Sequence, residues 1–359
     1  MQNNGYDSSQ TVIAVDAMGG DFAPREIVKG VAMVTRESPV HVILVGDEAR
    51  IREELQDLEY AAEQIEIVHT DQVIGNEDHP REALEQKSEA SMIVAAKLIA
   101  EGRAHGLVSA GNTGAYVLAS SLFIPRIKGV QKTAIAAVYP TRNRQKRRDI
   151  FAMVLDVGAN IHCSAANLVQ FAIMGQVYAA DIKGIEDPTV ALLNIGKESY
   201  KGGQTLSEVY RILAEAPNIN FIGNIEGNDI LKGLADVVVT EGYVGNIVMK
   251  TVEGLTDIMK EMGRYAFKHR FIWRLGMIAL SGLIRDVKKL TDYSEYGGAP
   301  LLGYKEIVIK AHGRSRAKAI KNAVKLAAKS HRDRICERME REITQVLPQS
   351  ANPSQPRKL

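Results

Sequence analysis

Short apolar runs alternate with amphipathic stretches along this chain of 359 residues. Residues 12–15 form the first run, V-I-A-V, and Asp16 ends it. A run that is apolar at every position is typical of a strand buried on both faces of a parallel sheet. Further strands are predicted at 40–45, 65–68, 106–109, 135–138, 151–155, 190–195, 220–222, 237–239 and 307–309. Because helical periodicity separates most of them, the pattern predicts an α/β fold with a mostly parallel sheet.

One connection departs from this alternation. Residues 139–149 join two apolar runs directly, which predicts the tip of a hairpin. The connection carries five basic residues: Arg142, Arg144, Lys146, Arg147 and Arg148. Two interpretations stay open, a solvated charged loop and a docking patch for an acidic surface.

Composition narrows the class of protein. The hydrophobic content of 45% is ample for a core, and 45 Lys and Arg against 43 Asp and Glu leave a net charge of +2, so nucleic acid is not an expected partner. Cys163 and Cys336 show no metal-ligand spacing, which indicates a reducing cytoplasm. Residues 1–10 lack an apolar signal core, and we expect 1–10 and 348–359 to be disordered tails.

The turn after the first strand is a candidate ligand site. It reads D-A-M-G-G-D, and Gly19 and Gly20 can take backbone angles that bring main-chain N–H groups close to a bound group. Asp21 comes next, near the N-cap of a helix predicted to begin around Pro24. Since ligands of open α/β sheets bind beside the carboxyl ends of strands, the first strand is predicted to deliver a site. Asp16 and Asp21 are expected to orient lysines or backbone.

A second glycine-containing turn follows the strand at 106–109. Its position between a strand and an apolar helix at 115–123 is that of a backbone anion site, and phosphate is its natural occupant. A tight turn without a ligand is the alternative. The candidate phosphate-binding residues here are Ser109, Gly111, Asn112, Thr113 and Gly114.

Three further polar residues also follow predicted strands. Lys201 precedes two glycines and could neutralise a phosphate or an oxyanion, or it could be a surface lysine. Asn246 could donate to an oxyanion or cap a helix. His312 could handle a proton, bind phosphate or serve as a structural histidine.

Residues 251–290 are predicted to be a helical segment for membrane or dimer contact. Within it, 271–284 is apolar on nearly all sides, contains the only tryptophan and has basic residues on both flanks. It is too short to span a bilayer, which needs roughly 20 residues. A helical hairpin that lies in the membrane interface fits this composition. The alternative is a dimer interface or a pair of core helices. The predicted membrane-contact residues are Trp273, Met277, Ile278 and Leu280.

The order of the motifs over residues 12–335 closely resembles the bacterial phosphate acyltransferase family. The matching strings after the first strand are S-A-G-N-T-G-A (109–115), F-I-x-R-I-K-G (123–129), L-D-V-G-A-N (155–160), A-I-M-G (172–175), L-L-N-I-G (192–196), N-F-I-G-N (220–224), A-D-V-V-V-T-E-G-Y-V-G-N (235–246), E-Y-G-G-A (295–299) and I-K-A-H-G (309–313).

The resemblance implies a three-layer α/β/α fold with a mixed, mostly parallel sheet, like that of isocitrate and isopropylmalate dehydrogenases and phosphotransacetylase. Residues 12–335 would form one catalytic unit of two intertwined subdomains. A long-chain acyl group would pass from acyl carrier protein to inorganic phosphate, giving acyl phosphate for phospholipid synthesis. Lys201, Asn246 and His312 would be catalytic, with no metal, no cofactor and no covalent intermediate.

The resemblance also implies partners and a location. We expect a homodimer in the cytoplasm, attached peripherally to the inner face of the cell membrane and passing its product to a downstream acyltransferase. Two alternatives remain, an acyl-coenzyme A enzyme like phosphotransacetylase and a non-catalytic membrane-docked scaffold. A nicotinamide dehydrogenase is disfavoured because the chain has no G-x-G-x-x-G string.

Overall fold

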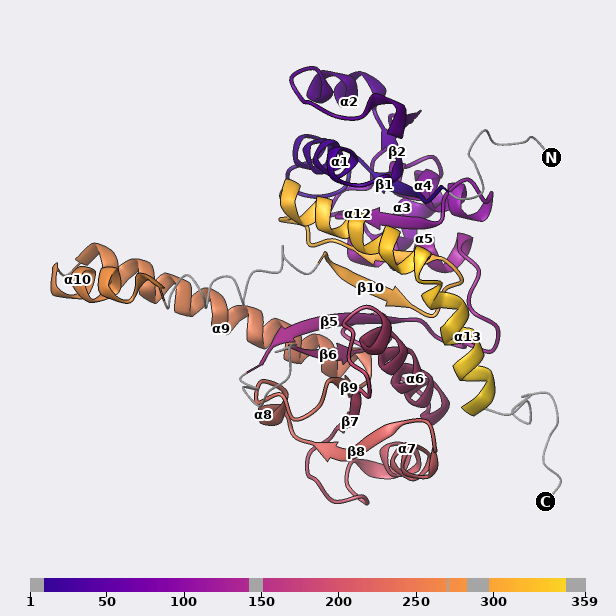
Figure 1. The fold of residues 1–359 in the computed structure, drawn as a ribbon, viewed down its shortest axis with the longest axis vertical. Coiled ribbons are helices and arrows are strands. Elements are labelled where there is room, and N and C mark those ends of the chain that lie inside the picture. The colour runs from indigo at the N-terminus through magenta and orange to yellow at the C-terminus, as the bar shows by residue number, and fades with distance from the viewer. Residues whose placement is uncertain (1–9, 142–150, 270, 283–296, 347–359) are drawn as a thin grey trace.

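The computed structural model describes residues 10–141, 151–269, 271–282 and 297–346 (Figure 1). Their strands form one sheet of eleven in the order β3-β2-β1-β4-β11-β10-β5-β6-β9-β7-β8. Helices cover both faces, and the sheet is mixed but mostly parallel. The predicted α/β class is therefore confirmed.

The sheet has two parallel halves. The first half contains β1 (Val12–Asp16), β2 (His41–Gly46), β3 (Ile65–His69), β4 (Gly106–Ser109) and β11 (Ile307–Lys310). The second half contains β6 (Phe151–Leu155), β7 (Thr189–Leu193), β8 (Asn220–Ile225) and β9 (Val237–Val239). Between them lie β10 (Ala299–Leu302) and β5 (Ala134–Pro140), which pair antiparallel with each other.

Strand direction reverses between the halves. β10 is antiparallel to both β11 and β5, and β5 is antiparallel to β6. The carboxyl ends of β1, β4 and β11 therefore lie together on one side of the sheet, where these strands end. We call this side the first edge. The carboxyl ends of β6, β9 and β7 lie at a different edge, the second edge.

Alternating side chains of the strands build the two apolar layers. Along β1, Ile13 and Val15 belong to one buried cluster, whereas Val12 and Ala14 belong to the other. This is the period of two expected of a strand, and because both faces are covered, every position from Val12 to Val15 is apolar. The uninterrupted runs of the sequence are explained by this double burial.

The helices lie in the connections and at the C-terminal end. Their bounds are α1 (Arg25–Glu37), α2 (Glu48–Leu55), α3 (Pro80–Gln86), α4 (Ser91–Ala100), α5 (Thr113–Phe123), α6 (Ala165–Asp181), α7 (Gly203–Glu215), α8 (Gly227–Ile230), α9 (Gly242–His269), α10 (Phe271–Ala279), α12 (Ala317–Arg332) and α13 (Ile335–Val346), with a 3-10 turn at Ala62–Gln64. α1 packs on α12, where a Cβ at Gly30 would come within 2.7 Å of the Ala317 carbonyl oxygen. This close approach needs glycine.

α9 and α10 project from the body of the molecule (Figure 1). The exposed side chains along them are mostly large and apolar: Leu255, Ile258, Met259, Met262, Tyr265, Phe267, Phe271, Ile272, Trp273, Leu275, Ile278 and Leu280. Such a patch exceeds what single scattered surface residues explain and marks an interaction surface. Among the described helices, none combines the length and the apolarity that crossing a bilayer requires.

The hairpin predicted around residues 139–149 is confirmed by the β5–β6 pairing, whereas its basic tip, 142–148, lies outside the described residues. The tails 1–9 and 347–359 also lie outside them. β10 has no counterpart among the predicted strands. The strand predicted at 190–195 ends two residues earlier, because the Asn194 side chain bonds the Ile195 N–H and the Lys201 carbonyl.

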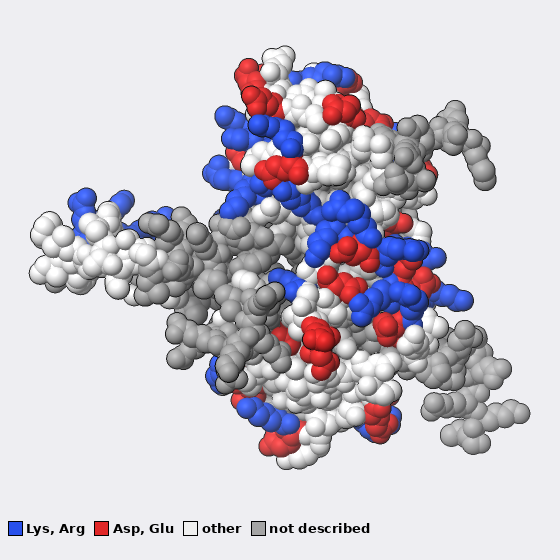
Figure 2. Space-filling view, viewed as in Figure 1, with Lys and Arg blue, Asp and Glu red and all other residues white. Residues whose placement is uncertain are grey.

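Basic side chains gather over α12 and the neighbouring helices on one face (Figure 2). Much of this charge is compensated locally. Lys321 and Lys325 of α12 both pair with Glu37 of α1, and Arg338 of α13 pairs with Asp181 of α6. These ion pairs join helices that are distant in the sequence.

Candidate active site

A hydrogen-bonded carboxylate lies at the centre of the first edge. Asp16, only 1% exposed, accepts hydrogen bonds of 2.6 Å from the hydroxyls of Ser109 and Ser91, and one of 3.2 Å from the Met18 N–H. Burial raises the pKa of Asp16, and the hydrogen bonds from Ser109 and Ser91 oppose that shift. Asp16 thus connects β1, its own following turn, β4 and α4.

The turns after β1, β4 and β11 pack backbone against backbone. A Cβ at Gly19 would lie 2.8 Å from the Gly111 nitrogen, and one at Gly20 would lie 3.2 Å from the Gly313 carbonyl oxygen. Gly20 also has φ +110°, which disfavours other residues. The Asp21 N–H donates to the Gly313 oxygen at 2.9 Å. Glycine is needed here for close approach, as the sequence indicated.

Asp21 is exposed and lies at the mouth of these turns. Its Oδ1 accepts a hydrogen bond of 2.9 Å from the Asn76 side chain. α1 begins at Arg25 with Pro24 at its N-cap and has no side-chain cap, so Asp21 does not cap it. The carboxylate therefore faces the connection between β3 and α3.

Asn112 is the N-cap of α5. Its Oδ1 accepts from the Ala115 N–H at 3.1 Å, and its amide donates to the carbonyls of Asp78 and Asn76 at 3.1 and 3.2 Å. Thr113 and Gly114 open the helix and are exposed, and backbone N–H groups in a first helical turn have no intrahelical acceptor. The predicted phosphate turn therefore presents N–H donors to solvent, while Asn112 holds its shape.

His312 lies on the surface after β11. Its Nδ1 accepts the Arg314 N–H at 3.1 Å. Partial desolvation lowers the pKa of His312. The carboxylate of Glu253, on α9, opposes this shift, whereas the charge of Lys310 lowers the pKa further. α9 thus reaches the first edge near residue 253.

Lys201 and Asn246 lie at the second edge. Lys201 is partly buried in the loop after β7, where its carbonyl accepts from Asn194 at 2.9 Å. Asn246 lies one turn inside α9, which begins at Gly242, so it is not an N-cap. The Asn246 amide donates to the Val157 carbonyl at 3.1 Å.

Asp156 is a buried residue of the second edge that the sequence reasoning did not single out. Its Oδ1 accepts the N–H groups of Ile135, Gly158 and Ala159, each at 3.0 Å. Its Oδ2 accepts both the backbone and the side chain of Asn160 at 2.8 Å. Burial raises the pKa of Asp156, and the hydrogen bonds to its carboxylate oppose that rise. The available signal was the string L-D-V-G-A-N, which repeats the strand, aspartate and glycine order seen around Asp16.

The predicted site residues consequently fall into two groups. The first edge brings together Asp16, Gly19, Gly20, Asp21, Ser109, Gly111, Asn112, Thr113, Gly114 and His312. Lys201 and Asn246 belong to the second edge. α9 connects the edges, because its first turns contact the loop after β6 and Glu253 influences His312.

The predicted membrane residues lie on α10 or just after it. Trp273, Ile278 and Leu280 are 43, 53 and 55% exposed, whereas the Met277 side chain lies outside the described part of the structure. In the described ranges, no group of three or more His, Cys, Asp or Glu side chains could hold a metal ion.

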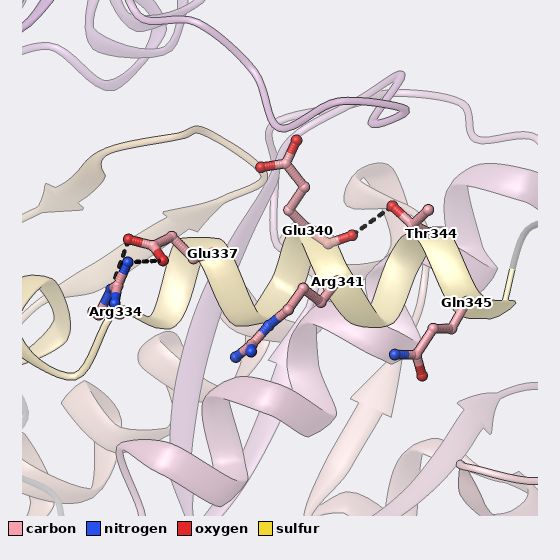
Figure 3. Close-up of a pocket in the computed structure, with 6 residues that line it drawn as sticks. All are labelled: Arg334, Glu337, Glu340, Arg341, Thr344 and Gln345. Carbon is pink, nitrogen blue, oxygen red and sulfur yellow. Dashed lines mark hydrogen bonds and ion pairs between the residues drawn. The ribbon is translucent and has the colours of Figure 1, made fainter.

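A surface hollow along α13 is a poor candidate for chemistry (Figure 3). Polar residues of α13 line it together with Arg334, which directly precedes the helix and pairs with Glu337 at 2.5 Å. None of the predicted site residues lines this hollow. The two sheet edges therefore remain the candidate sites.

Known proteins resemble this chain over most of its length. Residues 11–338 match the family described as "Fatty acid synthesis protein". The chain is 46% identical over 319 residues to the phosphate acyltransferase of Dictyoglomus thermophilum, covering 88% of this chain and 93% of that protein. It is 41% identical over 320 residues to the phosphate acyltransferase of Nitratidesulfovibrio vulgaris, covering 89% and 91%.

Solved structures share the fold at lower identity. A phosphotransacetylase from Streptococcus pyogenes superposes with a TM-score of 0.62 at 18% identity, covering 90% of this chain and 94% of the other. The EutD phosphotransacetylase of Staphylococcus aureus gives 0.57 at 16% identity, covering 89% and 94%. Because the family model matches residues 11–338 and two relatives are 41 and 46% identical over about nine tenths of the chain, this protein belongs to the phosphate acyltransferase family of enzymes.

Proposed function

We propose that this enzyme transfers a long-chain acyl group from acyl carrier protein to inorganic phosphate, giving acyl phosphate for phospholipid synthesis. Membership of the phosphate acyltransferase family supports the reaction class. The observation that carries the phosphate assignment is the start of α5 at the first edge. Thr113 and Gly114 are exposed there beside the closely packed glycine turns, and N–H groups of a first helical turn have no intrahelical acceptor.

The chemistry needs little from the protein beyond positioning. A phosphate oxygen is already an anionic nucleophile, and its attack on the thioester carbon forms a C–O bond. The C–S bond then breaks, and the thiol, with an ordinary pKa of about 8.5, departs as thiolate. Substrate alignment and stabilisation of the oxyanion are the contributions required, and no acyl-enzyme is needed.

In this proposal the first edge holds phosphate. The turns at Gly19, Gly20, Gly111 and Gly114 and the N–H of Thr113 approach the anion, and Asp16 fixes the turns through Ser109. Asp21 and Asn112 lie around the opening of this phosphate site. His312 stands beside this site and takes part in proton handling or phosphate binding.

Lys201 and Asn246 are proposed to stabilise the oxyanion from the second edge. Since an oxyanion donor must lie about 3 Å from the reacting oxygen, this role needs the two edges to close on one thioester. Asn246 has a second amide N–H besides the one directed at Val157, and this donor supports the role. A homodimer is proposed as the working form, with the exposed apolar stripe of α9 as a packing surface.

α10 is proposed to contact the inner face of the cell membrane from the cytoplasm. Its exposed tryptophan and aliphatic side chains suit the boundary between headgroups and acyl chains. A long-chain acyl phosphate is ill suited to diffusion through water, so release beside the bilayer to a downstream acyltransferase makes chemical sense. No cofactor is invoked.

The decisive experiment measures free thiol from acyl carrier protein thioester with and without phosphate, with the coenzyme A thioester run in parallel. We expect release to require phosphate, to yield acyl phosphate and to proceed with chelator present. Equal release without phosphate would identify a hydrolase. Preference for the coenzyme A thioester would identify an enzyme like phosphotransacetylase, and no release from either would favour a scaffold.

A further inference from the structure

Lys310 is a buried lysine at the carboxyl end of β11. It is 8% exposed, although lysine is almost never buried without a partner. In the β4–β11 register it lies opposite Ser109, whose hydroxyl bonds Asp16. The last residues of three adjacent strands thus place a carboxylate, a hydroxyl and an ammonium group in a row at the first edge.

The ammonium group has unused donors. Nζ donates to the Ala311 carbonyl at 2.5 Å, and this is its one hydrogen bond to the described residues. An ammonium group has three N–H donors, and a buried charge that lacks acceptors is costly. The remaining donors of Lys310 therefore call for another acceptor.

Burial makes Lys310 responsive to pH. Burial lowers its pKa to about 8, while the carboxylates of Asp16 and Asp21 act in the opposite direction. The neighbouring titratable groups are His312, whose pKa Lys310 depresses, and the buried Tyr116, which is influenced by Asp16. The ammonium form predominates below about pH 8 and is lost above it.

We propose that Lys310 is the cationic residue of the phosphate subsite, donating from Nζ to a phosphate oxygen beneath the turns at Gly20 and Gly111. This inference rests on the proposed function and names the residue that neutralises its nucleophile. An inorganic phosphate bound there supplies the acceptors that Nζ lacks. The backbone N–H groups of the surrounding turns bind the other oxygens.

The test compares Lys310→Met, Lys310→Arg and the control Lys305→Met, whose lysine is exposed in the turn before the same strand. We expect Lys310→Met to raise the KM for phosphate by about 10- to 100-fold, because a hydrogen bond to a charged group is lost. The KM for the carrier thioester should stay near that of the parent. Calorimetric titration with inorganic phosphate alone should show the same loss of affinity.

The pH profile provides a readout that a merely structural lysine would not move. In the parent, the KM for phosphate should rise above about pH 8 as Lys310 loses its proton. Lys310→Arg keeps its charge, so this rise should disappear. Ionisation of phosphate itself is common to all variants and cancels in the ratio of variant to parent.

Each outcome decides the inference. An unchanged phosphate KM and an unchanged calorimetric affinity in a folded Lys310→Met would overturn it while leaving the acyl transfer intact. If Lys310→Met does not fold, the pH profile of Lys310→Arg decides, and persistence of the rise above pH 8 would count against the inference. A parent enzyme that releases thiol equally without phosphate would instead refute the proposed function.

Discussion

The Ser109 hydroxyl donates a hydrogen bond of 2.6 Å to Oδ2 of Asp16 and so joins β4 to β1 across 93 positions of sequence. Oδ1 of the same carboxylate accepts the Ser91 hydroxyl, so two donors from separate elements depend on one buried side chain. An amide in this place would offer only one acceptor oxygen, and its NH2 group would face a donor.

Asp16→Asn is therefore expected to lower the free energy of unfolding by roughly 2–4 kcal/mol, because a buried hydroxyl loses its acceptor. Urea denaturation measures this change. Asp57→Asn, which alters an exposed carboxylate, is the control and should leave the transition midpoint unchanged. Coinciding transitions for both variants and the parent would show that the network is not stabilising.

Two glycines of α9 should respond oppositely to alanine. A Cβ at Gly245 would lie 1.8 Å from the Asp156 carbonyl oxygen, whereas nothing lies within 4 Å of one at Gly254. Gly245→Ala should destabilise the protein by at least about 1–3 kcal/mol through overpacking. Gly254→Ala should stabilise it by up to about 1 kcal/mol through helix propensity. Thermal unfolding of the pair tests this, and a stable Gly245→Ala would mean that α9 does not dock on this loop.

The cysteines should be dispensable for turnover. Desolvation raises the pKa of Cys163 to about 11 and that of Cys336 further, so both remain thiols at neutral pH. A nucleophilic cysteine needs a lowered pKa. The double variant Cys163→Ala, Cys336→Ala should therefore keep activity within about threefold of the parent. Mass spectrometry after rapid quench should find no acylated protein. A trapped acyl-enzyme would contradict direct attack by phosphate.

The second-edge donors should affect turnover more than folding. Asn246→Ala and Lys201→Ala are expected to lower kcat on the order of a hundredfold or more, as loss of an oxyanion donor does. Lys128→Ala, on an exposed turn, is the control. Steady-state kinetics and circular dichroism on the same samples separate the two effects. Activity within about threefold of the parent would show that Lys201 and Asn246 have structural roles and do not stabilise the oxyanion.

The exposed side chains of α10 should control attachment to lipid. Ile278→Glu with Leu280→Glu is expected to abolish sedimentation with vesicles of phosphatidylglycerol and phosphatidylcholine while preserving turnover on soluble carrier protein. Leu122→Glu, another exposed apolar position, should still sediment. Trp273 emission in the parent should shift to shorter wavelength on addition of vesicles. A double variant that dissociates and unfolds would assign the segment to the subunit interface.

The strands with buried faces were predictable because their pattern is local. The runs at 106–109, 151–155 and 237–239 agree with β4, β6 and β9 at both ends. β10 was missed since Pro300 and the preceding Gly297 and Gly298 resemble a loop, and only its antiparallel neighbours make it a strand.

The candidate site was predictable by residue type but not by arrangement. The hairpin that joins β5 to β6 was predicted, but a pattern of apolar runs carries no strand order. The pattern therefore did not show that this reversal places Lys201 and Asn246 at a different edge from Ser109. Lys310 was overlooked because the predicted strand ended at residue 309. Its burial depends on packing from the turns of β1 and β4, which are distant in sequence.

The tight contact at Gly245 also fixes the base of α9. Beyond it, Val248, Met249 and Val252 pack against a buried layer, so the first turns of the helix are held to the body. His269 lies 17 residues beyond Val252 (252 to 269), about 26 Å along the helix axis. If the helix bends beyond Val252, its far end can follow an uneven surface while Asn246 keeps its hydrogen bond to the Val157 carbonyl.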